Sequence, residues 1–187
     1  MNALASARHQ SRWESAADEH QVALAAFMDT GGQLDDAAWE RPWKAGKWTP
    51  AEITEHLSLA YEALLTEIRE GRPMAPKLGS WRMRVARWVI LPHILVHRSL
   101  PVRAPAPRET RPKAARAARA EALATLRHLG EEFERELDSA RRSGSLGITH
   151  PYFGRIEPIK ALRFVAIHME HHRRQVERAG AAGPESR

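Results

Sequence analysis

The chain has 187 residues, of which 43% are apolar, and this is enough for one well-filled core but not for two complete domains. It contains no cysteine, which excludes disulfide scaffolds, thiolate metal sites, iron–sulfur clusters and cysteine nucleophiles. Any metal must therefore be held by His, Asp or Glu. We expect a single domain over residues 1–187.

The formal net charge of +6 is unevenly distributed. Residues 71–120 carry twelve Lys and Arg residues against one acid, Glu109, so the remainder of the chain is net acidic. Because the basic character belongs to one segment, the overall charge is no argument for a nucleic-acid partner, and we expect none.

Neither a secretory signal nor a membrane span is predicted. Residues 1–13 lack an apolar core behind a basic start. The longest apolar stretch, 88–96, is interrupted by Pro92 and His93, whereas a spanning helix needs about 20 residues. We expect a cytoplasmic protein.

Two helices are predicted in the first part of the chain. Apolar residues at three- and four-residue steps indicate a helix over 9–28, which the glycines at 31 and 32 end, and residues 32–47 should form an irregular loop. The stretch from Thr49 to Glu52 is a capping box with Pro50 at the first helical position, so the second helix should start there and run to about Gly71. His56 lies on its apolar side.

Residues 72–112 form a basic, Pro-rich insertion that holds seven of the twelve prolines. Within it, 80–91 is predicted to be a short basic helix with Trp81 and Trp88, and 101–112 is expected to be extended and mobile. We expect the metal ligands described below to be independent of residues 101–112.

Two more helices are predicted after the insertion, over about 113–142 and from Glu157-Pro158 to about Ala179, followed by a short flexible tail over about 180–187. The apolar stripe of the third helix consists of Leu123, Leu126, Leu129 or Gly130, Phe133 and Leu137. Four amphipathic helices without a convincing strand pattern predict an all-α fold, a four-helix bundle.

Three histidines could hold a metal. His168 and His172 are one helical turn apart on the apolar side of the fourth helix, so their imidazoles can converge on one ion, and His56 offers a third ligand from the second helix. The alternative is that each is a packed histidine with one hydrogen bond. Burying three imidazoles without partners would cost about 1–3 kcal/mol each, and one ion would satisfy all three, which favours the metal.

The sequence also resembles the DinB-like superfamily of small bacterial proteins. The resemblance lies in three places. The stretch 48–57 is similar to the family's signature at the start of the second helix. The His150–Ile156 loop is similar to the family's HPxFG lead into the last helix, and His168–Gln175 is similar to its closing motif.

The resemblance implies a four-helix bundle with a long crossover between helices two and three, and often a homodimer. It also implies a divalent metal held by His56, His168 and His172, for which we expect zinc first, with nickel, iron or manganese as alternatives. Relatives include thiol-dependent transferases and isomerases that use mycothiol or bacillithiol, whereas many members have no known reaction.

Two functions remain as alternatives. The first is a metal-dependent transferase or hydrolase that acts on a small-molecule substrate; since the chain lacks cysteine, any thiol would come from a low-molecular-weight cosubstrate. Glu55 and His171 are adjacent to ligands in sequence, but Glu55 should point away from His56 as a solvated charge. The second is a non-catalytic metal-binding bundle whose basic insertion docks on an acidic partner or membrane surface.

Overall fold

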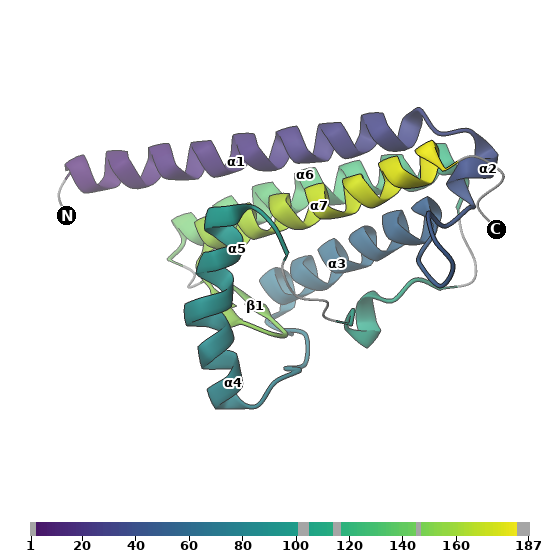
Figure 1. Ribbon diagram of the computed structural model, residues 1–187. Helices are drawn as coiled ribbons and strands as arrows, with labels where there is room; N and C mark the ends of the chain where they lie inside the picture. Colours follow the sequence, from purple (N-terminus) through teal and green to yellow (C-terminus); the bar gives the residue numbers. More distant parts are fainter. Residues whose placement is uncertain (1–2, 101–104, 114–116, 145–146, 183–187) are drawn as a thin grey trace.

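The computed structural model describes residues 3–100, 105–113, 117–144 and 147–182. Four long helices lie alongside one another as a bundle (Figure 1). They are α1 (Ala3–Gly32), α3 (Pro50–Glu70), α6 (Arg119–Arg142) and α7 (Pro158–Ala181). The predicted all-α bundle is therefore confirmed.

The smaller elements lie between these helices. They are α2 (Asp36–Trp39), α4 (Ser80–Val85), the π-helix η1 (Ala86–Ile90), α5 (Leu91–His97), the 3₁₀ turn η2 (Arg108–Thr110), β1 (Ile148–His150) and β2 (Gly154–Ile156).

Helix directions explain the long connection between α3 and α6. Arg141, in the last turn of α6, hydrogen-bonds Gln10 near the start of α1 at 3.1 Å, so these two helices are antiparallel. Arg69, in the last turn of α3, hydrogen-bonds Glu132 and Glu136 in the later half of α6, so α3 and α6 are parallel. Parallel neighbours require the chain to return along the bundle, and residues 71–118 supply that crossover.

The predicted start of α3 is confirmed in detail. The Thr49 hydroxyl accepts a hydrogen bond from the Glu52 amide at 3.1 Å, and the Glu52 carboxylate accepts one from the Thr49 amide at 2.8 Å. Pro50 occupies the first helical position, where no amide partner is needed. Gly71 ends the helix in the left-handed conformation at φ 66°.

The helix of the insertion is longer than predicted, because α4, η1 and α5 are continuous from Ser80 to His97. Pro92 does not break it. The Leu91 amide donates to the Ala86 carbonyl five residues back, so the π turn widens the helix just before a proline that has no amide to donate. This helix crosses the bundle axis instead of following it (Figure 1).

A two-stranded hairpin was not predicted, and each of its strands has only three residues, too few to show an alternating pattern. Ile148 pairs with Ile156, and His150 with Gly154. Gly147 leads into it at φ 103°, and a Cβ there would stand 1.8 Å from the Ile156 carbonyl oxygen, so only glycine fits.

Four predicted boundaries are corrected. Helix α1 extends beyond 9–28 in both directions, and the loop over 32–47 contains the short helix α2. Helix α6 starts at Arg119 instead of Lys113; its N-cap, Ala118, offers no capping side chain. Helix α7 continues to Ala181, so the tail begins later than 180, and 183–187 lie outside the described residues.

The segment expected to be extended over 101–112 is described only from 105, and there it forms the turn η2, with Thr110 only 2% exposed. Within the described ranges, no helix combines the length and the apolar character that a membrane span requires.

Candidate metal site

The fold brings the three predicted histidines together. His56 lies on α3, and His168 and His172 lie one turn apart on α7. Each offers one ring nitrogen, and the three nitrogens are within 4.8 Å of one another. The Nε2 atoms of His168 and His172 are 3.0 Å apart, and the His56 ring centroid lies 5.4 and 5.1 Å from theirs.

Hydrogen bonds on the outer nitrogens orient two of these rings. His56 Nδ1 is 2.7 Å from the carbonyl oxygen of Thr110, which can only accept, so Nδ1 carries the proton and Nε2 keeps its lone pair. His172 Nδ1 is 2.9 Å from Gln175 Oε1, which assigns the same tautomer. The Gln175 amide nitrogen lies 3.0 Å from His171 Nε2, consistent with this amide orientation.

Burial keeps these imidazoles neutral. The pKa of His168 and that of His172 lie well below the usual value, first because both rings are desolvated and then because other histidines are close. Burial also lowers the pKa of His56, and the Thr110 carbonyl partly opposes this effect. At neutral pH the three rings are therefore uncharged, and His56 and His172 each present an Nε2 lone pair to the cluster.

This donor set fits a divalent ion. Two nitrogens that each lie about 2.0–2.1 Å from one zinc ion cannot be more than about 4.2 Å apart. The Nε2 atoms of His168 and His172, 3.0 Å apart, are within this limit. All three ligand nitrogens lie within 4.8 Å of one another, and small side-chain rotations can bring the longest of these distances below about 4.2 Å. Two lone pairs facing each other repel unless a proton or a cation lies between them.

Aromatic rings pack against two of the three histidines. Trp48, directly before the capping box, lies 4.9 Å from the His56 ring, and Phe164 stacks on His168 at 6.2 Å with an interplanar angle of 18°. His56 and His172 are 5% and 7% exposed, whereas His168 is half-buried. His168 is therefore the least buried of the three residues.

Thr110 is the site residue that sequence reasoning missed. Its contribution is a backbone carbonyl, which every residue type has, so no side-chain pattern could have indicated it. The contact also corrects the expectation that the ligand set is independent of residues 101–112, because the segment positions His56.

Glu55 differs from the solvated charge that was expected. It is half-buried, and its Oε1 accepts a hydrogen bond from the Lys113 amide at 2.9 Å, which ties the end of the insertion to α3. His171 is also half-buried; its Nε2 lies next to the Gln175 amide nitrogen, and its ring meets His172 edge-on at 5.2 Å.

His150, in the loop before α7, belongs to an aromatic group next to the site. Its ring stacks on Phe153 at 4.7 Å and meets Phe164 edge-on at 4.9 Å. Burial lowers the pKa of His150 to about 4. It therefore acts as a neutral packing residue that supports Phe164, which itself stacks on His168.

A second buried polar cluster joins α1, α3 and α6. His20 is 1% exposed; its Nδ1 lies 2.8 Å from Glu134 Oε2 and its Nε2 lies 2.7 Å from the Tyr61 hydroxyl. Burial and the Glu134 charge raise the pKa of Tyr61 far above its usual value, so Tyr61 donates its proton to His20. No sequence motif connects these residues.

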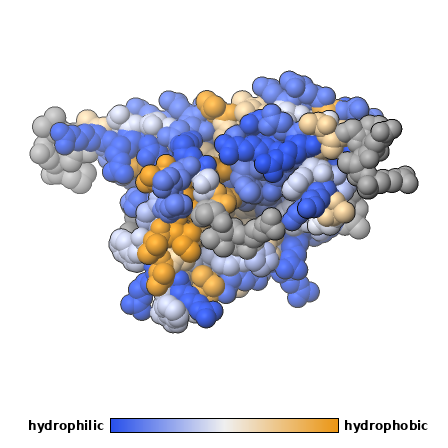
Figure 2. All heavy atoms as spheres, in the orientation of Figure 1, coloured by the Kyte–Doolittle hydropathy of each residue, from blue (hydrophilic) through white to orange (hydrophobic). Residues whose placement is uncertain are grey.

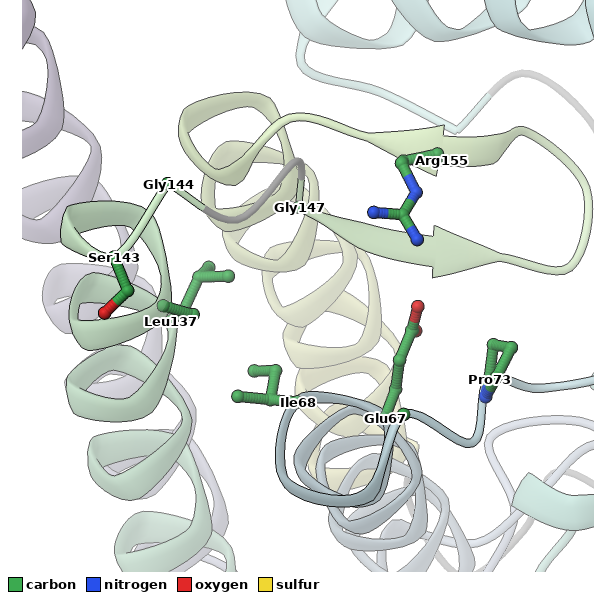
Figure 3. A pocket seen from close by; sticks show the side chains of 10 residues that line it. Glu67, Ile68, Pro73, Leu137, Ser143, Gly144, Gly147 and Arg155 are labelled. Atoms are coloured by element: carbon green, nitrogen blue, oxygen red, sulfur yellow. The ribbon is translucent and has the colours of Figure 1, made fainter.

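A separate cavity of about 440 Å³ lies at the ends of α3 and α6, next to the hairpin, and none of the three histidines lines it. Figure 3 shows the Glu67 side chain directed toward the hairpin from the end of α3. Both Glu67 oxygens accept from the Thr149 amide, at 2.9 and 2.8 Å. This carboxylate therefore holds the hairpin on the bundle.

Comparison with known proteins identifies the family. The model of the DinB superfamily matches residues 19–176, a range that includes all three histidines. The chain belongs to the DinB superfamily. No curated protein and no solved structure gives a significant match.

Proposed function

We propose that this DinB superfamily protein is a divalent-metal-dependent enzyme that acts on a small molecule. The observation that carries the proposal is the convergence of His56, His168 and His172 from two helices, with their ring nitrogens within 4.8 Å of one another. Membership of the DinB superfamily and the half-buried position of His168 support it.

A divalent ion on three imidazoles with an open position supplies Lewis-acid chemistry and lowers the pKa of a bound water or thiol. The chain's own groups provide the framework. Thr110 and Gln175 fix the tautomers of His56 and His172, and Trp48 and Phe164 pack against the rings of His56 and His168.

A thiol cosubstrate is the form of this proposal that we favour. The chain has no cysteine, so a thiolate nucleophile must come from outside. A low-molecular-weight thiol would lose its proton to solvent, and its sulfur would form a bond to the electrophilic carbon as the bond to the leaving group, such as a halide, breaks. Hydrolysis with water as the nucleophile is the competing reaction. We propose zinc as the ion, because neutral imidazoles with one open position are typical of catalytic zinc sites.

Cobalt-substituted protein offers a direct test. We expect one Co²⁺ per chain, with visible bands that change on addition of mycothiol or bacillithiol as a thiolate–cobalt charge-transfer absorption appears. The His168→Ala variant should show neither spectrum, whereas the control His128→Ala, at an exposed position on α6, should behave as the wild type.

Turnover is then measured with an aryl halide and each thiol, and in parallel with an activated ester and no thiol. Metal-dependent turnover of the halide supports transfer, and metal-dependent turnover of the ester alone supports hydrolysis. Wild-type protein that binds Co²⁺ but shows no spectral response to thiol would contradict the transferase form.

A further inference from the structure

The helix of the insertion carries an exposed apolar stripe that the metal site does not explain. Trp81, Val85 and Trp88 follow four- and three-residue steps and are 66%, 48% and 72% exposed. Val89 and Val96 extend the exposed apolar surface, at 62% and 75%. We call these five residues the apolar stripe; Figure 2 shows hydrophobic atoms gathered over this helix and bordered by hydrophilic ones.

The same helix has a second apolar face, and that face is buried. Ala86, Leu91 and Ile94 are 3–4% exposed and belong to the core, and Met83 packs against Gly154 of the hairpin. The helix therefore has one apolar side that packs on its own bundle and a second that faces solvent. Large exposed apolar surfaces of this kind mark interaction sites.

Positive charge flanks the stripe. The segment 80–98 contains Arg82, Arg84, Arg87 and Arg98 and no acid. Arg98 is paired with Glu19 at 2.7 Å, which ties this end of the helix to α1. Within the described part of the chain, the three other arginines have no acidic partner, and the Arg82 and Arg87 guanidinium groups lie 5.7 and 5.8 Å from the ring centroids of Trp81 and Trp88.

We propose that this helix docks on the surface of an anionic lipid bilayer, lying in the plane of the interface with the apolar stripe among the headgroups. A helix of 18 residues is about 27 Å long, and interfacial helices insert their apolar face about 5–10 Å deep. Tryptophan favours the headgroup region, and arginines beside it meet anionic lipid phosphates.

A second copy of the chain and a nucleic acid fit this surface less well than a bilayer does. A second copy placed by two-fold symmetry would bring the same unpaired arginines of each chain close together without an acid in either helix. A nucleic acid would neutralise the arginines but leave the valines and tryptophans without an apolar partner. An anionic bilayer satisfies both the charge and the apolar surface.

Flotation of the full chain with lipid vesicles tests the proposal. We expect binding to vesicles of phosphatidylcholine mixed with phosphatidylglycerol, much weaker binding to phosphatidylcholine alone, and release by high salt. The variant Arg82→Glu/Arg84→Glu/Arg87→Glu should lose at least about 100-fold in partition coefficient, since each cation near an anionic surface contributes about fivefold.

The matched control is Arg12→Glu/Arg127→Glu/Arg135→Glu, which makes the same change in net charge at exposed positions on α1 and α6 and should keep most of the binding. Trp81→Ser/Trp88→Ser should weaken binding while leaving the salt dependence in place. All variants should keep the wild-type circular dichroism and metal content, because the changed side chains are exposed.

Four outcomes would overturn the proposal. The first two are equal binding to neutral and anionic vesicles, and no binding to either. The third is an equal loss of binding in the two charge variants. The fourth is that the wild type binds no vesicles but forms a dimer, which the Trp81→Ser/Trp88→Ser change dissociates. Since none of these readouts involves the metal, the His168→Ala variant should still bind vesicles, and the two proposals can fail separately.

Discussion

At the scale of single residues, Gln175 connects two histidines of α7. Its Oε1 accepts from His172 Nδ1, and its amide nitrogen lies next to His171 Nε2. We predict that Gln175→Ala weakens zinc binding about 10- to 100-fold, because the His172 ring loses the partner that sets its tautomer and orientation. Isothermal titration calorimetry measures this, and Arg174→Ala, at the exposed preceding position, is the control. Equal affinities in the two variants would show that Gln175 does not position His172.

His150 should contribute a measurable pH dependence to stability. Its pKa is about 4 in the folded protein and about 6.5 when unfolded, so between these values the unfolded chain takes up a proton that the folded chain does not. The stabilisation is fully present above about pH 6.5 and is lost as the pH falls toward 4, by at most about 1.4 kcal/mol per pH unit.

We predict that the difference in unfolding free energy between wild type and His150→Asn shrinks as the pH is lowered from 7 to about 4.5, because Asn does not titrate but can still accept from the Tyr152 amide. Urea unfolding over this range measures it. His128→Asn, at an exposed position, should keep the wild-type curve. Parallel curves for His150→Asn and wild type would contradict the account.

The histidines of the site were predictable because ligand side chains on two helices follow the 3.6-residue period, which also decides which face is buried. Their support was only partly predictable. Gln175 lies within the motif that resembles the family, whereas Thr110 contributes a carbonyl from an irregular segment and could be found only from the fold.

At the scale of elements, the capping box starts α3 and thereby sets the register of His56. We predict that Thr49→Ala lowers the unfolding free energy by about 0.5–2 kcal/mol, because the Glu52 amide loses its acceptor. It should also weaken metal binding. The control Thr66→Ala removes a hydroxyl that bonds back to the Glu62 carbonyl within the same helix, and it should change stability by less than about 0.5 kcal/mol. Equal effects in the two variants would mean that the cap does not stabilise the start of α3.

Elements with strong local signals were predictable, and those that depend on packing were not. The start of α3 follows from four consecutive residues. The continuation of the insertion helix through Pro92 depends on a π turn, and the hairpin depends on the Glu67 carboxylate and on space next to Gly147. Neither has a sequence period that would reveal it.

At the scale of the whole molecule, the cluster of His20, Tyr61 and Glu134 connects three of the four bundle helices. We predict that Tyr61→Phe lowers the unfolding free energy by about 1–3 kcal/mol, because the buried His20 Nε2 loses its donor. Tyr152→Phe is the control, since its hydroxyl donates to the Pro105 carbonyl at an exposed position and its loss should cost less. Chemical unfolding measures both. A larger loss in Tyr152→Phe would contradict this role of the cluster.

The bundle could be predicted from the four amphipathic helices, and the resemblance to the DinB-like superfamily implied the long crossover that parallel α3 and α6 require. The position of that return path could not. It runs close enough to α3 for Thr110 and Lys113 to hydrogen-bond His56 and Glu55, so the segment supports the site as well as connecting helices.

The central claim is that His56, His168 and His172 hold one divalent ion. Zinc titration of tag-free, metal-stripped protein by calorimetry tests it most directly. We predict one ion per chain. Each of the variants His56→Ala, His168→Ala and His172→Ala should lose more than about 100-fold in zinc affinity, which is the largest loss expected when a residue that only hydrogen-bonds a ligand is removed. The control His93→Ala, on the exposed side of α5, should bind as the wild type. One ion bound with wild-type affinity in all three variants would contradict the account.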